Sequence, residues 1–123
     1  KEPLGHVLGF EWFYGYRFHV NGDVLIPRPE TEELVGNVLA YYDEMFEGQD
    51  VVAADIGTGS GAIAISLQKE EPHLKMYASD ISEKAVEVAQ ANANSLEADV
   101  TFLVGDMLQP LIDREIKLDI LLQ

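Results

Sequence analysis

The sequence predicts an incomplete doubly wound α/β domain, in which helices cover both faces of a parallel β-sheet, preceded by a β-hairpin. Two observations lead to this expectation. From residue 51 onward, short apolar segments alternate with helical segments, an order typical of parallel sheets. Ahead of them, apolar and aromatic segments flank an Asn-Gly pair, which favours a hairpin. The 123 residues suit one small domain.

The first part of the chain is expected to contribute the hairpin and one helix. Residues 1–10, KEPLGHVLGF, are interpreted as the tail of an earlier element. In YRFHVNGDVLI the hairpin turn is placed at Asn21-Gly22-Asp23, and Pro27 and Pro29 end any further strand. Apolar residues at helical spacing predict a helix over ETEELVGNVLAYYDEMF, whose acidic first turn suits a helix N-terminus.

Strands and helices are expected to alternate after residue 50. The predicted strands are VVAAD, KMYASD, VTFLVGD and KLDILLQ. The predicted helices are GAIAISLQKE and SEKAVEVAQANAN, the second with Ser82 as its N-cap. The link MLQPLIDREI, between the last two strands, is too short for more than a couple of helical turns.

Composition narrows the classes of function. A formal charge of −14 argues against nucleic acid and anionic membrane surfaces, and a basic protein partner or a small ligand fits better. The chain has no cysteine, so it has neither disulfides nor thiolate metal sites, and His6, His19 and His73 lack metal-ligand spacing. With no membrane-spanning apolar segment and no signal peptide, we expect a cytoplasmic protein without a bound metal.

The stretch ADIGTGSGAIAISL carries the strongest functional signal. A strand runs through Asp55 into Gly57-Thr58-Gly59-Ser60-Gly61 and then a helix, whose N-terminus offers free N–H groups. Glycines permit unusual backbone angles and let a ligand approach the backbone closely. A tight turn without a ligand is the alternative, but three alternating glycines exceed what a turn requires.

Two cofactor classes fit this loop by spacing. Gly57, Gly59 and Ala62 satisfy the loose dinucleotide fingerprint, and Asp80 follows at about the expected interval of 20 residues. Asp55 favours S-adenosylmethionine, because a carboxylate repels a pyrophosphate but attracts a cationic cofactor that has no phosphate. At the end of the second strand, Asp80 can accept both ribose hydroxyls with either cofactor.

A third carboxylate, Asp106, ends the third strand of the predicted sheet. The carboxyl ends of parallel strands lie at one edge, outside which ligands bind. Asp55, Asp80 and Asp106 therefore predict an acidic rim that suits a cation with a polar base. A turn or helix cap is the alternative for Asp106.

These motifs resemble those of a known family. DIGTGSGAIAISL resembles the cofactor loop of class I S-adenosylmethionine-dependent methyltransferases, whose fold is Rossmann-like. VLIPRPETEELV resembles the signature of the HemK-type protein-(glutamine-N5) methyltransferases, and the chain from PLGHVLGF onward is similar to that family's pattern. The resemblance implies that residues 1–28 hold the end of a linker and the hairpin, and that residues 29–123 hold the cofactor-binding half of the domain.

The resemblance also implies roles for individual residues toward S-adenosylmethionine. Gly57 to Gly61 would contact its methionine part, Asp80 its ribose, and the Asp106-Met107 pair its adenine, with Met107 where an aromatic residue is sometimes found. A helix start accounts for Pro29 and the glutamates of RPETE but not for Arg28 and Thr31, which are therefore candidates to face the cofactor pocket.

The substrate that the resemblance implies is the glutamine of the Gly-Gly-Gln motif in peptide chain release factors. An amide nitrogen is a poor nucleophile, and the family aims it with the Asn of an Asn-Pro-Pro-Tyr segment. That Asn is expected just after Gln123, and the helical domain that binds the release factor is expected before residue 1. We therefore expect no catalytic residue within the chain, no activity from the chain alone, and self-association through its unpaired fourth strand.

Other functions stay open at this point. A ribosomal-protein glutamine is an alternative substrate. An Asn-Pro-Pro-Tyr adenine methyltransferase is another alternative, which the negative charge disfavours. The chain could also be a non-catalytic module that binds a cofactor or a partner.

Overall fold

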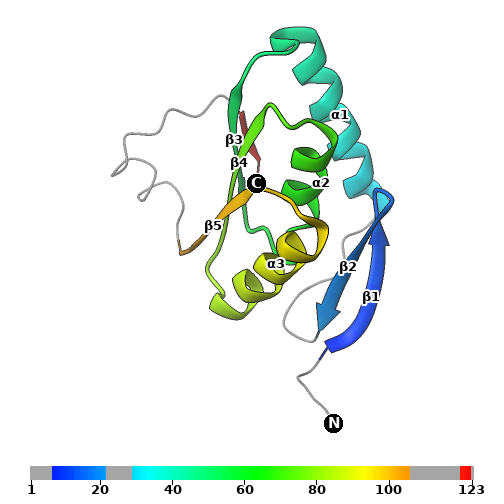
Figure 1. The fold of residues 1–123 in the computed structure, drawn as a ribbon, viewed down its shortest axis with the longest axis vertical. Helices are drawn as coiled ribbons and strands as arrows, with labels where there is room; N and C mark the ends of the chain where they lie inside the picture. The colour runs from blue at the N-terminus through cyan, green and yellow to red at the C-terminus, as the bar shows by residue number, and fades with distance from the viewer. Residues whose placement is uncertain (1–6, 22–28, 106–119, 123) are drawn as a thin grey trace.

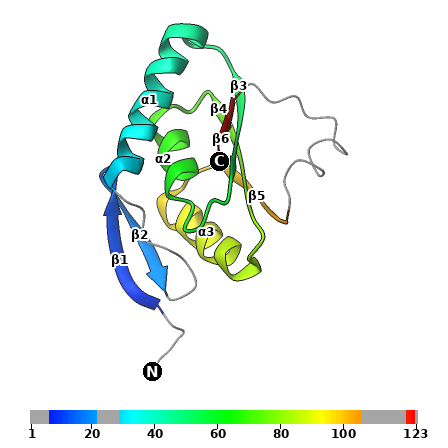
Figure 2. The same ribbon diagram turned by 180° about the vertical axis from the view of Figure 1, so that it is seen from behind.

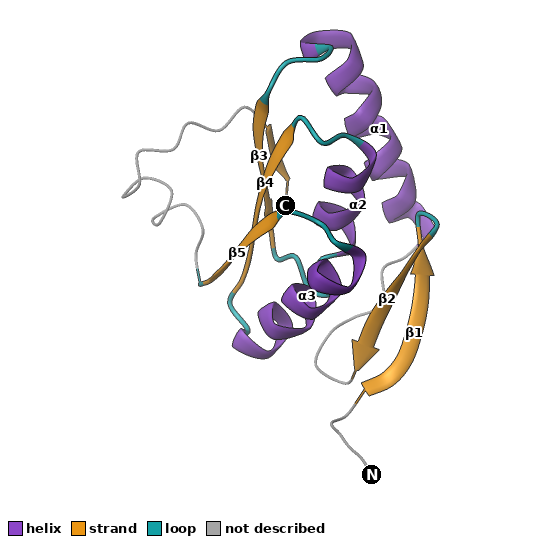
Figure 3. Ribbon diagram, viewed as in Figure 1, coloured by secondary structure: helices purple, strands orange, loops and turns teal. Residues whose placement is uncertain are grey.

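The computed structural model describes residues 7–21, 29–105 and 120–122. A hairpin comes first, followed by helices that alternate with the strands of a second sheet (Figure 3). In chain order the elements are β1 (Val7–Phe13), β2 (Tyr16–Asn21), α1 (Pro29–Phe46), β3 (Val51–Ile56), α2 (Ala62–Glu70), β4 (Leu74–Asp80), α3 (Glu83–Leu96), β5 (Val100–Val104) and β6 (Ile120–Leu122).

The main sheet is parallel and reverses its direction of winding at β3. Its strands lie in the order β5-β4-β3-β6. β3 pairs with β4 along its whole length and with β6 through Ala53, Ala54 and Asp55. The chain moves outward from β3 to β5 and then returns to the other side of β3, which is the strand order of a doubly wound sheet. In such sheets ligands bind beside the carboxyl ends of the strands at the point of reversal.

The described helices form one layer between the main sheet and the hairpin (Figures 1 and 2). α2 and α3 lie on the same face because both crossovers, β3 to β4 and β4 to β5, advance in the same direction and such crossovers are right-handed. The sequence predicts helices on both faces, whereas the described residues place helices on one face alone. The connection from β5 to β6 falls in residues 106–119, outside the described part.

The main hydrophobic core extends from the sheet through the helical layer to the hairpin. The residues whose spacing predicted helix α1 all face it and are buried or half-buried: Leu34, Val35, Val38, Leu39, Tyr42 and Phe46. Phe13 and Phe18 of the hairpin join the same core, with their rings 6.2 Å apart in an edge-on arrangement. The hairpin is thus packed against the helices through its inner face.

The hairpin turn lies earlier than the sequence predicted. β1 and β2 pair from Phe13↔Tyr16 outward, so the turn is Tyr14-Gly15 and not Asn21-Gly22-Asp23. Both turn residues have positive φ, 52° and 83°, as a tight type I′ connection requires. Residues 7–10, interpreted above as the tail of an earlier element, belong to strand β1. Gly22 and Asp23 lie outside the described residues.

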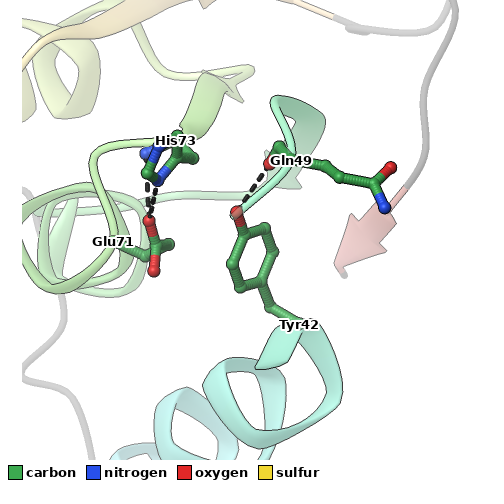
Figure 4. Close-up of polar contacts among 4 residues, drawn as sticks. All are labelled: Tyr42, Gln49, Glu71 and His73. Atoms are coloured by element: carbon green, nitrogen blue, oxygen red, sulfur yellow. Dashed lines mark hydrogen bonds and ion pairs between the residues drawn. The ribbon is translucent and has the colours of Figure 1, made fainter. Parts of the chain in front are cut away.

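Polar contacts lie at the edge of the main sheet where its parallel strands begin (Figure 4). The Tyr42 hydroxyl donates to the carbonyl of Gln49 across the loop that joins α1 to β3. Burial raises the pKa of this phenol. The His73 ring contacts the Glu71 carboxylate at 2.6 Å, in the turn between α2 and β4. These contacts anchor the loops that precede β3 and β4.

Candidate cofactor site at the carboxyl edge of the sheet

The glycine-rich loop folds back onto the end of strand β4. The backbone N–H groups of Gly57 and Thr58 both donate to the carbonyl of Ser79, at 2.8 and 2.9 Å. Gly57, Gly59 and Gly61 have positive φ angles of 78°, 57° and 85°. Side chains rarely adopt this left-handed region, so the path of the loop explains the alternating glycines.

Two of these glycines face open space, and one is tightly packed. A Cβ atom built on Gly57 or Gly59 would meet nothing within 4 Å. A Cβ on Gly61 would lie 3.0 Å from Cδ1 of Ile65 and 3.1 Å from Cβ of Ala89. The loop therefore leaves room for a ligand above its first part, while its end is fixed between α2 and α3.

Asp55 is a buried carboxylate at the end of β3, with 3% of its surface exposed. Its Oδ2 accepts a hydrogen bond from the Thr58 hydroxyl at 2.9 Å. Burial raises the pKa of Asp55 to about 6; the bond from Thr58 opposes this shift, and the nearby charge of Asp80 adds to it. Among the described residues Asp55 has no cationic partner. A buried carboxylate beside a second carboxylate provides an environment that favours a positively charged ligand.

Asp80 connects the end of β4 to both neighbouring loops. Its Oδ2 accepts from the Gly59 N–H at 3.0 Å, and its Oδ1 accepts from the Ser82 N–H at 2.9 Å. Its carbonyl accepts from the Gly105 N–H after β5. Ser82 in turn caps α3 by accepting from the Ala85 N–H, as the sequence predicted. Each carboxylate oxygen keeps acceptor capacity for a further donor, such as a ribose hydroxyl.

Asn92 of α3 is a site residue that sequence reasoning missed. It is fully buried, and its Nδ2 donates to the Ser60 carbonyl of the glycine loop at 2.9 Å. The signal in the sequence was an amide on the stripe of α3 whose other buried residues are all alanines, Ala85, Ala89 and Ala93. A buried amide on such a stripe must find hydrogen-bond partners, so it marks a contact with backbone.

The structure gathers most of the predicted site residues and leaves others undescribed. Asp80 and the loop residues Asp55, Gly57, Thr58, Gly59, Ser60 and Gly61 lie together at the carboxyl edge. Thr31 lies half-buried in the first turn of α1, and no described hydrogen bond joins it to the loop. Arg28, Asp106 and Met107 fall outside the described residues, so their predicted roles stay predictions.

The described residues contain neither a metal-binding cluster nor a membrane-spanning helix. No group of three or more His, Asp or Glu side chains there is arranged to hold a metal ion. None of the described helices is both long and apolar enough to cross a membrane.

Comparison with curated proteins gives relatives that carry the name the sequence resemblance indicated. A "Release factor glutamine methyltransferase" of Bacillus anthracis is 48% identical over 118 residues, which are 96% of this chain and 42% of the relative. The protein of the same name from Bacillus subtilis strain 168 is 48% identical over 97% of this chain and 42% of its own length. The chain thus spans about two fifths of the curated relatives that it matches.

Solved structures share the fold. Pyrococcus abyssi tRNA (uracil-54, C5)-methyltransferase, crystallised with S-adenosyl-L-homocysteine, superposes with a TM-score of 0.57 at 20% identity, over 79% of this chain and 23% of that one. The model of the methyltransferase small domain family matches residues 39–122, which include the whole glycine loop and the main sheet. The chain therefore belongs to the methyltransferase small domain family and has its Rossmann-like fold.

Proposed function

We propose that this chain supplies the cofactor-binding part of an enzyme that methylates the side-chain amide of a glutamine in a peptide chain release factor. The observation that carries the proposal is the 48% identity, over 96% of the chain, to a protein named release factor glutamine methyltransferase. The substrate is the glutamine of the Gly-Gly-Gln motif, as the signature around RPETE implies.

The residues at the carboxyl edge fit S-adenosylmethionine better than a dinucleotide. The buried carboxylate of Asp55 and the carboxylate of Asp80 concentrate negative charge beside the glycine loop. A pyrophosphate would be repelled there, whereas the sulfonium and ammonium groups of S-adenosylmethionine would be attracted. The open space above Gly57 and Gly59 gives the ligand access to the loop backbone.

The bound cofactor supplies an electrophilic methyl group, and the residues of the chain hold and orient it. Asp80, whose carboxylate accepts from the N–H groups of Gly59 and Ser82, would accept the ribose hydroxyls. Asp55 would balance the positive charge of the methionine part. Orientation of this kind is worth several kcal/mol in a displacement reaction.

The chemistry on the substrate side needs a group that positions the substrate amide. An amide nitrogen must be aimed at the methyl carbon because its lone pair is delocalised. We propose that this group is the Asn that the family resemblance places directly after Gln123. The chain alone is then expected to bind cofactor but not to transfer the methyl group.

Methyl transfer from radiolabelled S-adenosylmethionine to a purified release factor tests this proposal. The 123-residue chain is compared with a version extended through the Asn-Pro-Pro-Tyr segment and the strands after it. We expect incorporation of label with the extended version, and at least about 100-fold less with the chain alone, since loss of orientation costs at least this much.

Two matched controls make the assay specific. A release factor whose Gly-Gly-Gln glutamine is changed to alanine should accept no label, and changing the segment's Asn to alanine should abolish transfer by the extended version. Label on the altered release factor would show a different acceptor residue. Transfer by the chain alone at a comparable rate would show that the catalytic group lies within residues 1–123.

A further inference from the structure

We propose that Asn92 is a positioning residue that couples the hairpin to the glycine loop, so that cofactor binding and hairpin docking strengthen each other. The inference rests on the proposed cofactor site. It adds that strand β2, which lies on the far side of the helical layer from the sheet (Figure 1), helps to set the geometry of that site.

The coupling is built from one fully buried side chain. The Oδ1 of Asn92 accepts the backbone N–H of His19 at 2.6 Å, and its Nδ2 donates to the His19 carbonyl at 3.1 Å. The same Nδ2 donates to the Ser60 carbonyl at 2.9 Å. Because an N–H faces one end of the amide and two carbonyls face the other, only this orientation of the amide is compatible with its partners.

Aspartate or a hydrophobic residue could not make the same set of contacts. Two acceptors, the carbonyls of His19 and Ser60, and one donor, the N–H of His19, surround the end of this side chain. The side chain must therefore donate two hydrogen bonds and accept one. If the hairpin leaves α3, Asn92 loses both bonds to His19, and its orientation toward Ser60 is no longer fixed. A buried polar group with lost partners is costly, so the two contacts are maintained together.

Apolar contacts on the same helix reinforce this connection. Val20, next to His19 in β2, packs with Ala85 and Val88 of α3. One turn along the helix, Ala89 meets the end of the glycine loop, where a Cβ on Gly61 would lie 3.1 Å from its own Cβ. One side of α3 therefore touches both the hairpin and the cofactor loop, with Asn92 between their backbones.

The turn end of the hairpin is held separately. The Tyr14 N–H donates to the Glu32 carboxylate of α1, and the Tyr16 hydroxyl donates to Glu70 at the end of α2. When a ligand orders the glycine loop, the amide of His19 should therefore be stabilised through Asn92, and the amide of Tyr14 should be unaffected. Tyr14 provides an internal reference within the same hairpin.

Amide hydrogen exchange of the unsubstituted chain tests the coupling without any mutation. Coupling is reciprocal, so a ligand that orders the loop must stabilise hairpin docking by the same factor. With saturating S-adenosylhomocysteine, we expect exchange of the His19 amide to slow by about fivefold or more, and exchange of the Tyr14 amide to stay unchanged. Binding without any slowing at His19 would overturn the coupling while leaving the cofactor site intact. Failure to bind would contradict the cofactor proposal and, with it, the coupling.

Variants then assign the coupling to the Asn92 side chain. Asn92→Ala should weaken binding of S-adenosylhomocysteine by about tenfold and abolish the response of His19 to the ligand. Asn94→Ala, on the same helix but exposed and bonded through its side chain to Gln90, is the matched control and should change neither.

A purely structural role for Asn92 would give a different result. It would lower the midpoint of thermal unfolding but leave the response of His19 to the ligand in place, and that outcome would overturn the proposal. The single tryptophan, Trp12, lies exposed on β1 and offers a second readout, since its fluorescence reports on the hairpin. If Asn92→Ala does not fold, the exchange experiment on the unsubstituted chain still decides.

Discussion

Gly61→Ala is expected to lower the free energy of unfolding by about 2–5 kcal/mol, the sum of a left-handed backbone penalty and overpacking. Gly61 has a φ of 85°, which costs an L-residue roughly 1–2 kcal/mol. Its new methyl group would also press against Ile65 at 3.0 Å and Ala89 at 3.1 Å. The contact with Ala89 involves a side chain with no rotamer, so one of the two helices has to move.

Denaturant unfolding of Gly61→Ala beside Gly57→Ala measures this effect. Gly57 has nearly the same φ, 78°, but nothing lies within 4 Å of its Cβ position. Gly57→Ala should therefore show only the backbone penalty, about 1–2 kcal/mol. Equal losses for both variants would mean that the packing between α2, α3 and the loop is looser than the structure shows.

Asp55→Asn is expected to stabilise the protein near neutral pH while it weakens cofactor binding. Burial raises the pKa of Asp55 to about 6, above the ordinary value of 3.8. Between these two values the folded chain holds a proton that the unfolded chain releases. Protonated Asp55 therefore favours the folded state. This contribution to the free energy of unfolding is fully present below about pH 3.8 and is lost as the pH rises through about 6.

Asparagine keeps an acceptor for the Thr58 hydroxyl but carries no charge. The gain in the free energy of unfolding should be roughly 1–3 kcal/mol at pH 7.5 and should shrink toward zero near pH 4. Urea unfolding across this range measures it, with Asp99→Asn, at an exposed carboxylate, as the matched control expected to stay within about 0.5 kcal/mol. A variant that is less stable than the unsubstituted chain at pH 7.5 would show that the Asp55 charge is compensated in the free protein.

The alternation of strands and helices could be predicted because apolar periodicity is a local property. The sequence placed β3, α2, β4, α3 and β5 correctly, and the Ser82 cap followed from its own three-residue geometry. The hairpin turn was misplaced because Tyr14-Gly15 and Asn21-Gly22 both contain a glycine that can take positive φ. Which of these two pairs forms the turn depends on how Phe13 and Phe18 pack against the helices. That packing is a tertiary contact.

In the candidate site, too, the local features could be predicted and the tertiary contacts could not. The positions of the glycines, Asp55 and Asp80 at one edge of the sheet could be predicted because chain geometry at the end of a parallel strand fixes their place. Asn92 was missed because its partners, His19 and Ser60, are 73 and 32 residues away in the sequence. Its burial shows only when the hairpin is docked on α3.

Asp80→Ala tests the proposed ribose contact. Removing charge-assisted hydrogen bonds worth roughly 1.5–3 kcal/mol should weaken binding of S-adenosylhomocysteine by about tenfold or more. The carboxylate also holds the N–H groups of Gly59 and Ser82, so some loss of stability is expected as well. Affinity should therefore be measured well below the unfolding midpoint. Unchanged affinity would assign Asp80 to the loop structure alone.

The most direct test of the central claim is calorimetric titration of the unsubstituted chain with S-adenosylhomocysteine and with NAD. The buried charge of Asp55 and the adjacent charge of Asp80 predict that S-adenosylhomocysteine binds and that NAD binds more weakly or not at all. Tighter binding of NAD than of S-adenosylhomocysteine would contradict the account, because the glycine loop would then be holding a pyrophosphate beside two carboxylates.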